Sequence, residues 1–170
     1  MVHSTEGAAA MLEGVALAYY GLPLGFIERH NLPARVHGRG GEREVRFLWA
    51  DFPRVLPVWL PEGRLVLATW GNARDESCRL PVARWASLQT WADGGWTRYH
   101  AVPVDVPATL IADGRPELPV WVGIRQGLHA LLARDEVGRP RVFPFCEPAS
   151  HYYRIMTRSP WMPVFVGERF

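Results

Sequence analysis

The sequence contains no lysine, so every one of its basic residues is an arginine. Its formal net charge is only +2 over 170 residues, which excludes the strong overall field that draws highly basic proteins to nucleic acid or to membranes. Any site for an anion must therefore be a local patch. Arginine suits such a patch because its planar guanidinium makes paired hydrogen bonds to phosphate, although a GC-rich genome explains the same bias more simply.

Cysteine is also scarce, with only Cys78 and Cys146, and neither lies at a spacing typical of metal or redox sites. Two isolated thiols fit a reducing compartment, so we expect a cytoplasmic protein. No apolar run reaches the roughly 18 residues that a membrane span needs. The apolar stretch 8–20 contains Glu13 and lacks the basic start of a signal peptide. We therefore expect that the protein is not exported and has no membrane partner.

Motifs for metals and cofactors are missing as well. The six histidines are scattered, and no spacing directs two of them to one metal ion. Glycine-rich phosphate loops of the Walker or Rossmann type are absent, as is the GxSxG turn of serine hydrolases. The sequence therefore predicts no metal, no nucleotide cofactor and no other cofactor.

What the sequence has is typical of one globular domain over residues 1–170, because 48% of the residues are apolar and 21% are charged. Short apolar runs separated by turns predict an α+β fold, dominated by strands in a mixed or antiparallel sheet, barrel-like, with a few peripheral helices. Strands are expected at residues 44–50, 55–60, 65–70, 99–106, 120–124, 129–133, 141–145, 152–156 and 162–166.

Two helices are expected in addition. Ser4 or Thr5 can cap the first, and apolar residues three and four apart continue it to about Gly21. The second is expected over residues 81–92, with Pro81 in the first helical position. The polar, glycine-rich stretch 29–44 predicts a surface loop.

The most informative motif follows the expected strand 65–70. This strand ends in Trp70-Gly71 and continues into Asn72-Ala73-Arg74, which brings an aromatic ring, an amide and a cation together at a sheet edge. Such groups can hold a base and a phosphodiester of an unpaired strand. The alternative is that Trp70 packs in the core beside an ordinary surface turn.

Four segments carry a pattern in chain order. They are residues 53–71 (PRVLPVWLPEGRLVLATWG), residues 72–77 (NARDES), the pair 141–145 and 152–157, and residues 162–164 (MPV). Together they resemble the SOS-response-associated peptidase (SRAP) family, although the loop that separates Trp-Gly from Asn-Ala-Arg in that family is missing. The resemblance implies a protein that binds single-stranded DNA and traps abasic sites covalently.

The departures from the family pattern lie at its catalytic positions. The family's N-terminal cysteine is replaced by Val2, and its histidine by Ser159. Its acid–base glutamate falls on Gln126, or on Thr109 in another register. Because none of these replacements can act as thiol, acid or base there, the resemblance implies that only Asn72 of the four catalytic positions is kept.

The leading hypothesis is a SRAP-like protein that binds single-stranded or abasic DNA without efficient covalent capture. Its predicted contacts are stacking by Trp70 and Trp161, a hydrogen bond from Asn72, and phosphate binding by Arg74, Arg125 and Arg158. Two alternatives stay open. One is an active enzyme that uses the Val2 amine or the Cys78 thiol, and the other is a protein-interaction module.

Overall fold

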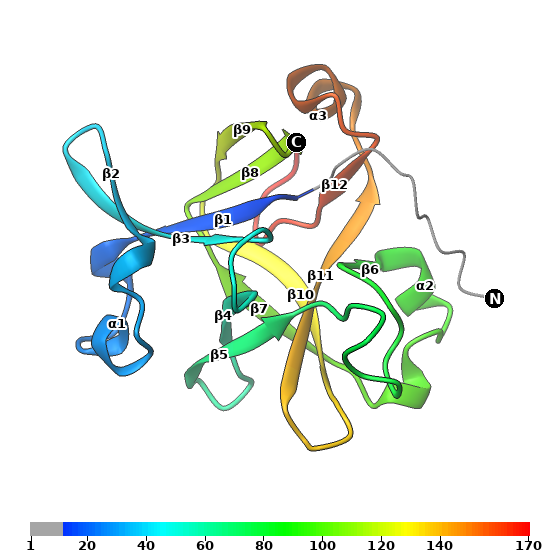
Figure 1. Cartoon of the computed structure of the whole chain (residues 1–170). Coiled ribbons are helices and arrows are strands. Elements are labelled where there is room, and N and C mark those ends of the chain that lie inside the picture. Colours follow the sequence, from blue (N-terminus) through cyan, green and yellow to red (C-terminus); the bar gives the residue numbers. More distant parts are fainter. Residues whose placement is uncertain (1–11) are drawn as a thin grey trace.

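The computed structural model describes residues 12–170, which form two β-sheets and a few short helices (Figure 1). The strands are β1 (Gly14–Ala18), β2 (Val36–Arg39), β3 (Glu42–Leu48), β4 (Val55–Trp59), β5 (Leu65–Trp70), β6 (Ala86–Ser87), β7 (Val102–Pro107), β8 (Leu110–Arg115), β9 (Leu118–Gly123), β10 (Gly127–Arg134), β11 (Pro140–Pro148) and β12 (Trp161–Pro163). The helices are α1 (Phe26–Arg29), α2 (Leu88–Ala92) and α3 (His151–Thr157), with 3-10 turns at Tyr19–Gly21, Pro33–Arg35 and Thr97–Tyr99.

The larger sheet closes into a barrel. Its strands follow the order β10-β7-β4-β5-β11-β12, and β10 also pairs with β11, so that five strands form a ring. All of these pairs are antiparallel except β5 with β11, which run parallel with Thr69 opposite Arg141. The short strand β6 adds a second parallel pair to β11. The predicted α+β, strand-dominated and barrel-like fold is therefore confirmed.

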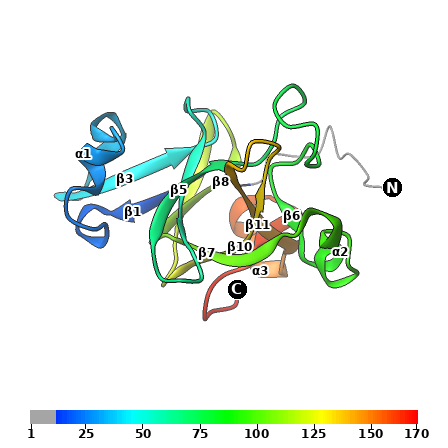
Figure 2. The ribbon, with the colours of Figure 1, turned by 90° about the horizontal axis from the view of Figure 1, so that it is seen from below.

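The smaller sheet is antiparallel throughout, in the order β2-β3-β1-β8-β9. Figure 2 shows β1 and β3 on one side of the barrel strands and α2 on the other. Strands β2 and β9 form the two edges of this sheet, and the hairpin of β8 and β9 leads to the barrel through the turn before β10.

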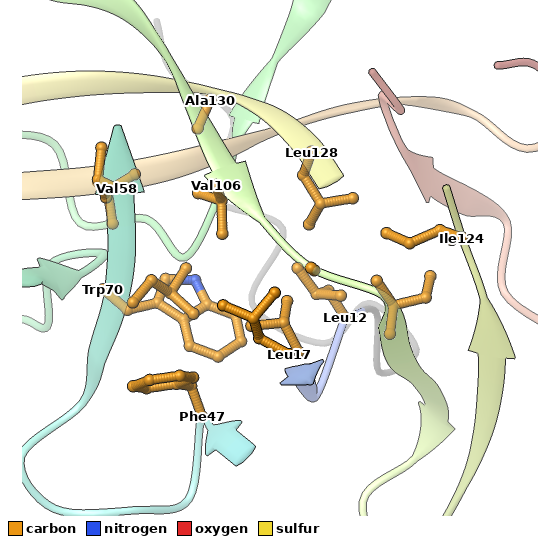
Figure 3. Packing of buried hydrophobic residues seen from close by; sticks show 14 of the residues in the cluster. Leu12, Leu17, Phe47, Val58, Trp70, Val106, Ile124, Leu128 and Ala130 are labelled. Atoms are coloured by element: carbon orange, nitrogen blue, oxygen red, sulfur yellow. The ribbon is translucent and has the colours of Figure 1, made fainter. Parts of the chain in front are cut away.

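One hydrophobic core joins the two sheets. Figure 3 shows side chains from both, with Leu17 and Phe47 from the smaller sheet and Trp70, Val106 and Leu128 from the barrel. These side chains are almost completely buried, and each contributes about 1.5–3 kcal/mol to stability by leaving water. A second cluster covers the outer face of the barrel beside α2. It contains Leu80, Ala86, Trp96, Leu131, Ala133, Phe143 and Phe145.

The helix expected from Ser4 or Thr5 to Gly21 is wrong over its described part. Residues 4–11 lie outside the described residues, and Gly14–Ala18 form β1 instead. This strand lies between β3 and β8, and four of its five residues are buried. A strand that is covered on both faces has a continuous apolar run in its sequence. Periodicity alone does not distinguish such a run from a buried helix.

The strand expected at residues 152–156 is also wrong, because this segment forms α3. The hydroxyl oxygen of Ser150 accepts a hydrogen bond from the backbone N–H of Tyr153 at 3.1 Å. This N-cap outweighs the strand preference of the two tyrosines that follow. The segment that resembles a late strand of the SRAP family is therefore helical.

Two further predictions need correction. The helix expected over 81–92 is limited to α2, because Asn72 and Ala83 pair as an isolated β-bridge and β6 comes before Leu88. The expected surface loop 29–44 contains β2, which forms a hairpin with β3. Gly40 and Gly41 make its turn with φ values of 56° and 86°, a conformation that suits glycine.

We expect Gly127→Ala to lower the free energy of unfolding by about 2–4 kcal/mol. Gly127 has a φ of 136°, and a Cβ there would lie 2.1 Å from the carbonyl oxygen of Val106. The matched control is Gly123→Ala, since a Cβ at Gly123 meets nothing within 4 Å. Urea unfolding followed by circular dichroism measures both variants, and equal midpoints would contradict the steric argument.

Candidate functional site

Asn72 closes the loop that follows β5. Its side chain is buried, and Nδ2 donates to the carbonyl oxygens of Ser77 at 2.9 Å, Leu80 at 3.0 Å and Pro81 at 3.2 Å. Its Oδ1 accepts a hydrogen bond from the backbone N–H of Ser77 at 2.9 Å. Because these contacts occupy the amide, the predicted hydrogen bond from Asn72 to a nucleotide is wrong. The residue organises the loop instead.

Trp70 belongs to the core rather than to a binding surface. Its side chain is fully buried, Nε1 donates to the carbonyl oxygen of Arg84 at 3.0 Å, and its ring meets Trp49 edge-on at 5.2 Å. Figure 3 shows the indole inside the barrel wall near Phe47. The predicted stacking of Trp70 on a base is therefore wrong, and the core alternative is right.

Arginines that the sequence did not single out surround Trp49. The guanidinium carbons of Arg54 and Arg84 each lie 4.4 Å from the centre of the Trp49 ring. Arg84 pairs with Glu13 at 2.9 Å. Burial lowers the pKa of Arg84 while the charge of Glu13 opposes the shift. Both arginines pack on Trp49, and Arg84 ties the start of β1 to the segment before β6.

Glu76 anchors the outer side of the same loop. Its carboxylate pairs with both Arg54 and Arg141. Burial alone would raise the pKa of Glu76, but the hydrogen bonds from Arg141 and Arg54 hold it below its usual value. The loop is thus fixed from within by an amide and from outside by a shared carboxylate.

Glu136, from the turn between β10 and β11, makes another contact with this loop. It accepts hydrogen bonds from Ser77 Oγ at 2.6 Å and from the backbone N–H of Arg79 at 2.7 Å. The Ser77 hydrogen bond is the main reason that the pKa of Glu136 falls to about 2, and Cys78 adds a weaker hydrogen bond. Cys78 is exposed, but a carboxylate with so low a pKa is too weak a base to take the thiol proton efficiently near neutral pH.

A groove lies between the β8–β9 hairpin and the end of α3, which Figure 1 shows at the same end of the molecule. Its volume is about 640 Å³. It is lined by Gly114, Arg115, Pro116, Glu117, Leu118, Val120, Met156, Thr157 and Arg158. We call it the hairpin–helix groove. Arg158 ends α3 with a φ of 60°, and it is the one predicted phosphate-binding residue that lines the groove.

A buried polar cluster adjoins this groove. Asp113 is fully buried and accepts hydrogen bonds from the Tyr153 hydroxyl, from the Gly114 N–H at 2.5 Å and from Ser159. Burial raises the pKa of Asp113 to about 6 in spite of these donors. Ser159, expected at a catalytic position, is thus buried against Asp113. The sequence analysis did not single out this cluster, although Asp113 within the otherwise apolar segment LIADG is a signal that could have indicated it.

The remaining predicted residues are dispersed. Arg125 and Gln126 are exposed in the turn before β10, where the Arg125 N–H donates to Glu168 Oε1 at 2.8 Å. Trp161 is half-buried in β12 and packs against the main core. Arg74 is exposed on the loop after β5, which lies in the lower half of Figure 1, whereas α3 lies at the top. The structure therefore does not gather all predicted residues in one trough.

Comparison with models of protein families, with curated proteins and with solved structures finds no match for this chain. Within residues 12–170, no helix combines the length and the apolar character needed to cross a membrane. The same residues contain no group of three His, Cys, Asp or Glu side chains suited to a metal ion. The cytoplasmic location and the SRAP resemblance stay predictions.

Asn72→Ala should destabilise the protein by about 2–4 kcal/mol, because it leaves buried backbone groups of the loop without partners. Trypsin should then cleave faster at Arg74 and Arg79, which are exposed on this loop. Asp75→Ala, also exposed there, is the matched control. A variant that keeps its stability but loses a ligand would show that Asn72 contacts that ligand.

Because of Asp113, the free energy of unfolding should fall as the pH rises from about 4 to about 6. Its folded pKa of about 6 lies above the ordinary 3.8, so the folded state holds the proton more tightly and loses this advantage as the pH rises. Linkage predicts that stability relative to Asp113→Asn falls by about 3 kcal/mol between pH 4 and pH 7. Urea unfolding of both proteins at several pH values measures this difference, and a constant difference would contradict the assignment.

Proposed function

We propose that this chain binds single-stranded DNA, including strands with abasic sites, reversibly in the hairpin–helix groove. The observation that carries the proposal is the placement of Arg115 on the hairpin wall and Arg158 on the helix wall. Two guanidinium groups on facing walls match the successive phosphates of an unpaired strand.

Apolar side chains between these cations provide surfaces for bases. Leu118 is 80% exposed, and Val120 and Met156 also line the groove. Tyr152 is 63% exposed and lies four positions before Met156 on α3, so the two share one face of the helix. Tyr152 does not line the groove itself, and we propose that a base beyond the Met156 end of the groove stacks on it, in the role first assigned to Trp70.

The charge balance of the groove sets the strength of binding. Glu117 opposes Arg115 and Arg158, which leaves the lining with one net positive charge. Such a site attracts a polyanion weakly and is sensitive to salt. We therefore expect a binder whose affinity falls steeply as ionic strength rises, rather than a tight complex.

Covalent capture is not part of the proposal. The Ser159 hydroxyl is buried against Asp113, and the amide of Gln126 does not ionise, so neither supplies the acid or base of the family's reaction. Val2, which replaces the family's cysteine, lies outside the described residues. The support for a DNA ligand is thus the groove chemistry together with the SRAP resemblance.

Fluorescence anisotropy with a labelled oligothymidylate tests the binding. Arg115→Ala and Arg158→Ala should each weaken binding several-fold and reduce the salt slope by about 0.7. Arg64→Ala is the matched control, because Arg64 is exposed on the β4–β5 turn. Absence of binding at low salt would refute the proposal and favour a protein-interaction module, since Leu118 and Ile155 expose apolar surface beside the groove.

Incubation with abasic DNA, with and without borohydride, tests the covalent alternative. We expect no adduct that survives a denaturing gel, since no residue of the groove is a nucleophilic amine or thiol. An adduct that depends on borohydride and disappears when the N-terminus is blocked would favour the Val2 amine. Loss of an adduct in Cys78→Ser would instead favour the thiol.

A further inference from the structure

A second pocket lies at one end of the closed barrel. Strands β4 and β10 end there and β7 begins there, because β7 runs antiparallel to both. Its volume is about 530 Å³, within the usual range for small-molecule sites. Its lining is Leu60, Pro61, Glu62, Arg79, Tyr99, His100, Val102, Leu132, Ala133, Arg134, Asp135, Glu136 and Gly138, none of which lines the hairpin–helix groove. We call it the barrel-end pocket.

We propose that the barrel-end pocket binds a small molecule that joins an apolar ring to one anionic group, such as a carboxylate, phosphate or sulfonate. The apolar part of the lining accounts for the ring. Leu60, Leu132 and Ala133 are buried, whereas Val102 is 42% exposed. Tyr99 is half-buried and packs against Trp96 at 5.6 Å between ring centres, so it presents a fixed aromatic wall.

Two of the three acids in the lining face cations outside it. Glu62 lies 3.6 Å from Arg64, and Asp135 lies 3.5 Å from Arg141. Asp135 also accepts hydrogen bonds from backbone N–H groups of its own turn, at 3.1 and 2.9 Å. These carboxylates are thus neutralised from outside, and they do not make the pocket a site for a cation.

The remaining charges favour an anion. With those two carboxylates paired, the lining has Arg79 and Arg134 against the single carboxylate of Glu136, which leaves one net positive charge. Arg134 is tied by one hydrogen bond to the Gly138 carbonyl at 2.9 Å. Within residues 12–170, the structure gives the Arg79 guanidinium neither an ion pair nor a hydrogen bond, which leaves all its donors available to a ligand.

Glu136 positions this arginine. Its carboxylate holds the backbone N–H of Arg79 at 2.7 Å and Ser77 Oγ at 2.6 Å, so it fixes the loop that carries the cation. Glu136 therefore acts through Arg79 and not on the ligand. Replacing it with glutamine keeps an acceptor for these donors, whereas alanine removes it.

Titration of the full chain with 8-anilino-1-naphthalenesulfonate, an apolar ring system with one sulfonate, tests the proposal by fluorescence. We expect saturable binding that weakens at least about tenfold in Arg79→Ala and in Val102→Glu, since each change reduces the positive charge at the pocket. The uncharged analogue N-phenyl-1-naphthylamine should bind more weakly than the sulfonate. Arg29→Ala, on α1, is the matched control and should bind like the parent chain.

The positioning role has its own readout. Glu136→Ala should lose binding as Arg79→Ala does, and Glu136→Gln should restore much of it, with unchanged circular dichroism for both. Amide shifts on binding should concentrate at residues 99–102 and 132–136. No saturable binding, an equal loss in Arg29→Ala, or shifts confined to residues 114–120 and 156–158 would overturn the proposal. Displacement of the probe by oligothymidylate would also overturn it, because the two sites would then be one.

Discussion

The pairing of β10 with β7 on one side and β11 on the other is the constraint on which this fold depends. It closes five strands into a ring, and a closed ring buries its own backbone edges. It also decides where ligands can reach the protein. The barrel-end pocket lies where β10 leaves the ring, and the hairpin–helix groove lies where β11 runs past it to α3 and β12.

Polar side chains then fix the loops that the barrel leaves irregular. Asn72 satisfies four backbone groups of one loop, and Glu136 holds the same loop from a turn about 60 residues later. The contacts of Asn72 are buried, and a buried donor or acceptor without a partner costs about 1–3 kcal/mol. Asp113 is the exception, since burial outweighs its donors and raises its pKa. Asn72 and Glu136 thus form a framework for one loop.

The sequence predicted strands where one face is buried and turns are well marked. The strand 65–70 is correct, because a short apolar run that follows a turn describes it. The sequence did not predict β1, because this strand is covered on both faces. It did not predict α3, because the helix depends on the N-cap hydrogen bond of one serine, Ser150. Trp70 and Asn72 were predicted to face a ligand, whereas both side chains are buried. A sequence shows which groups are present, but it does not show which way they point. The groove itself joins Arg115 and Arg158, which only the folded chain brings together.

The parallel pairing of β5 with β11 has a kinetic consequence. Thr69 meets Arg141 about 70 positions later, so β5 keeps one edge without a partner until nearly the whole chain has been synthesised. Pairings of such long range slow folding, towards milliseconds to seconds in small β proteins. During that time the unpaired edge of β5 is open to pairing with a second chain, which exposes the folding protein to aggregation.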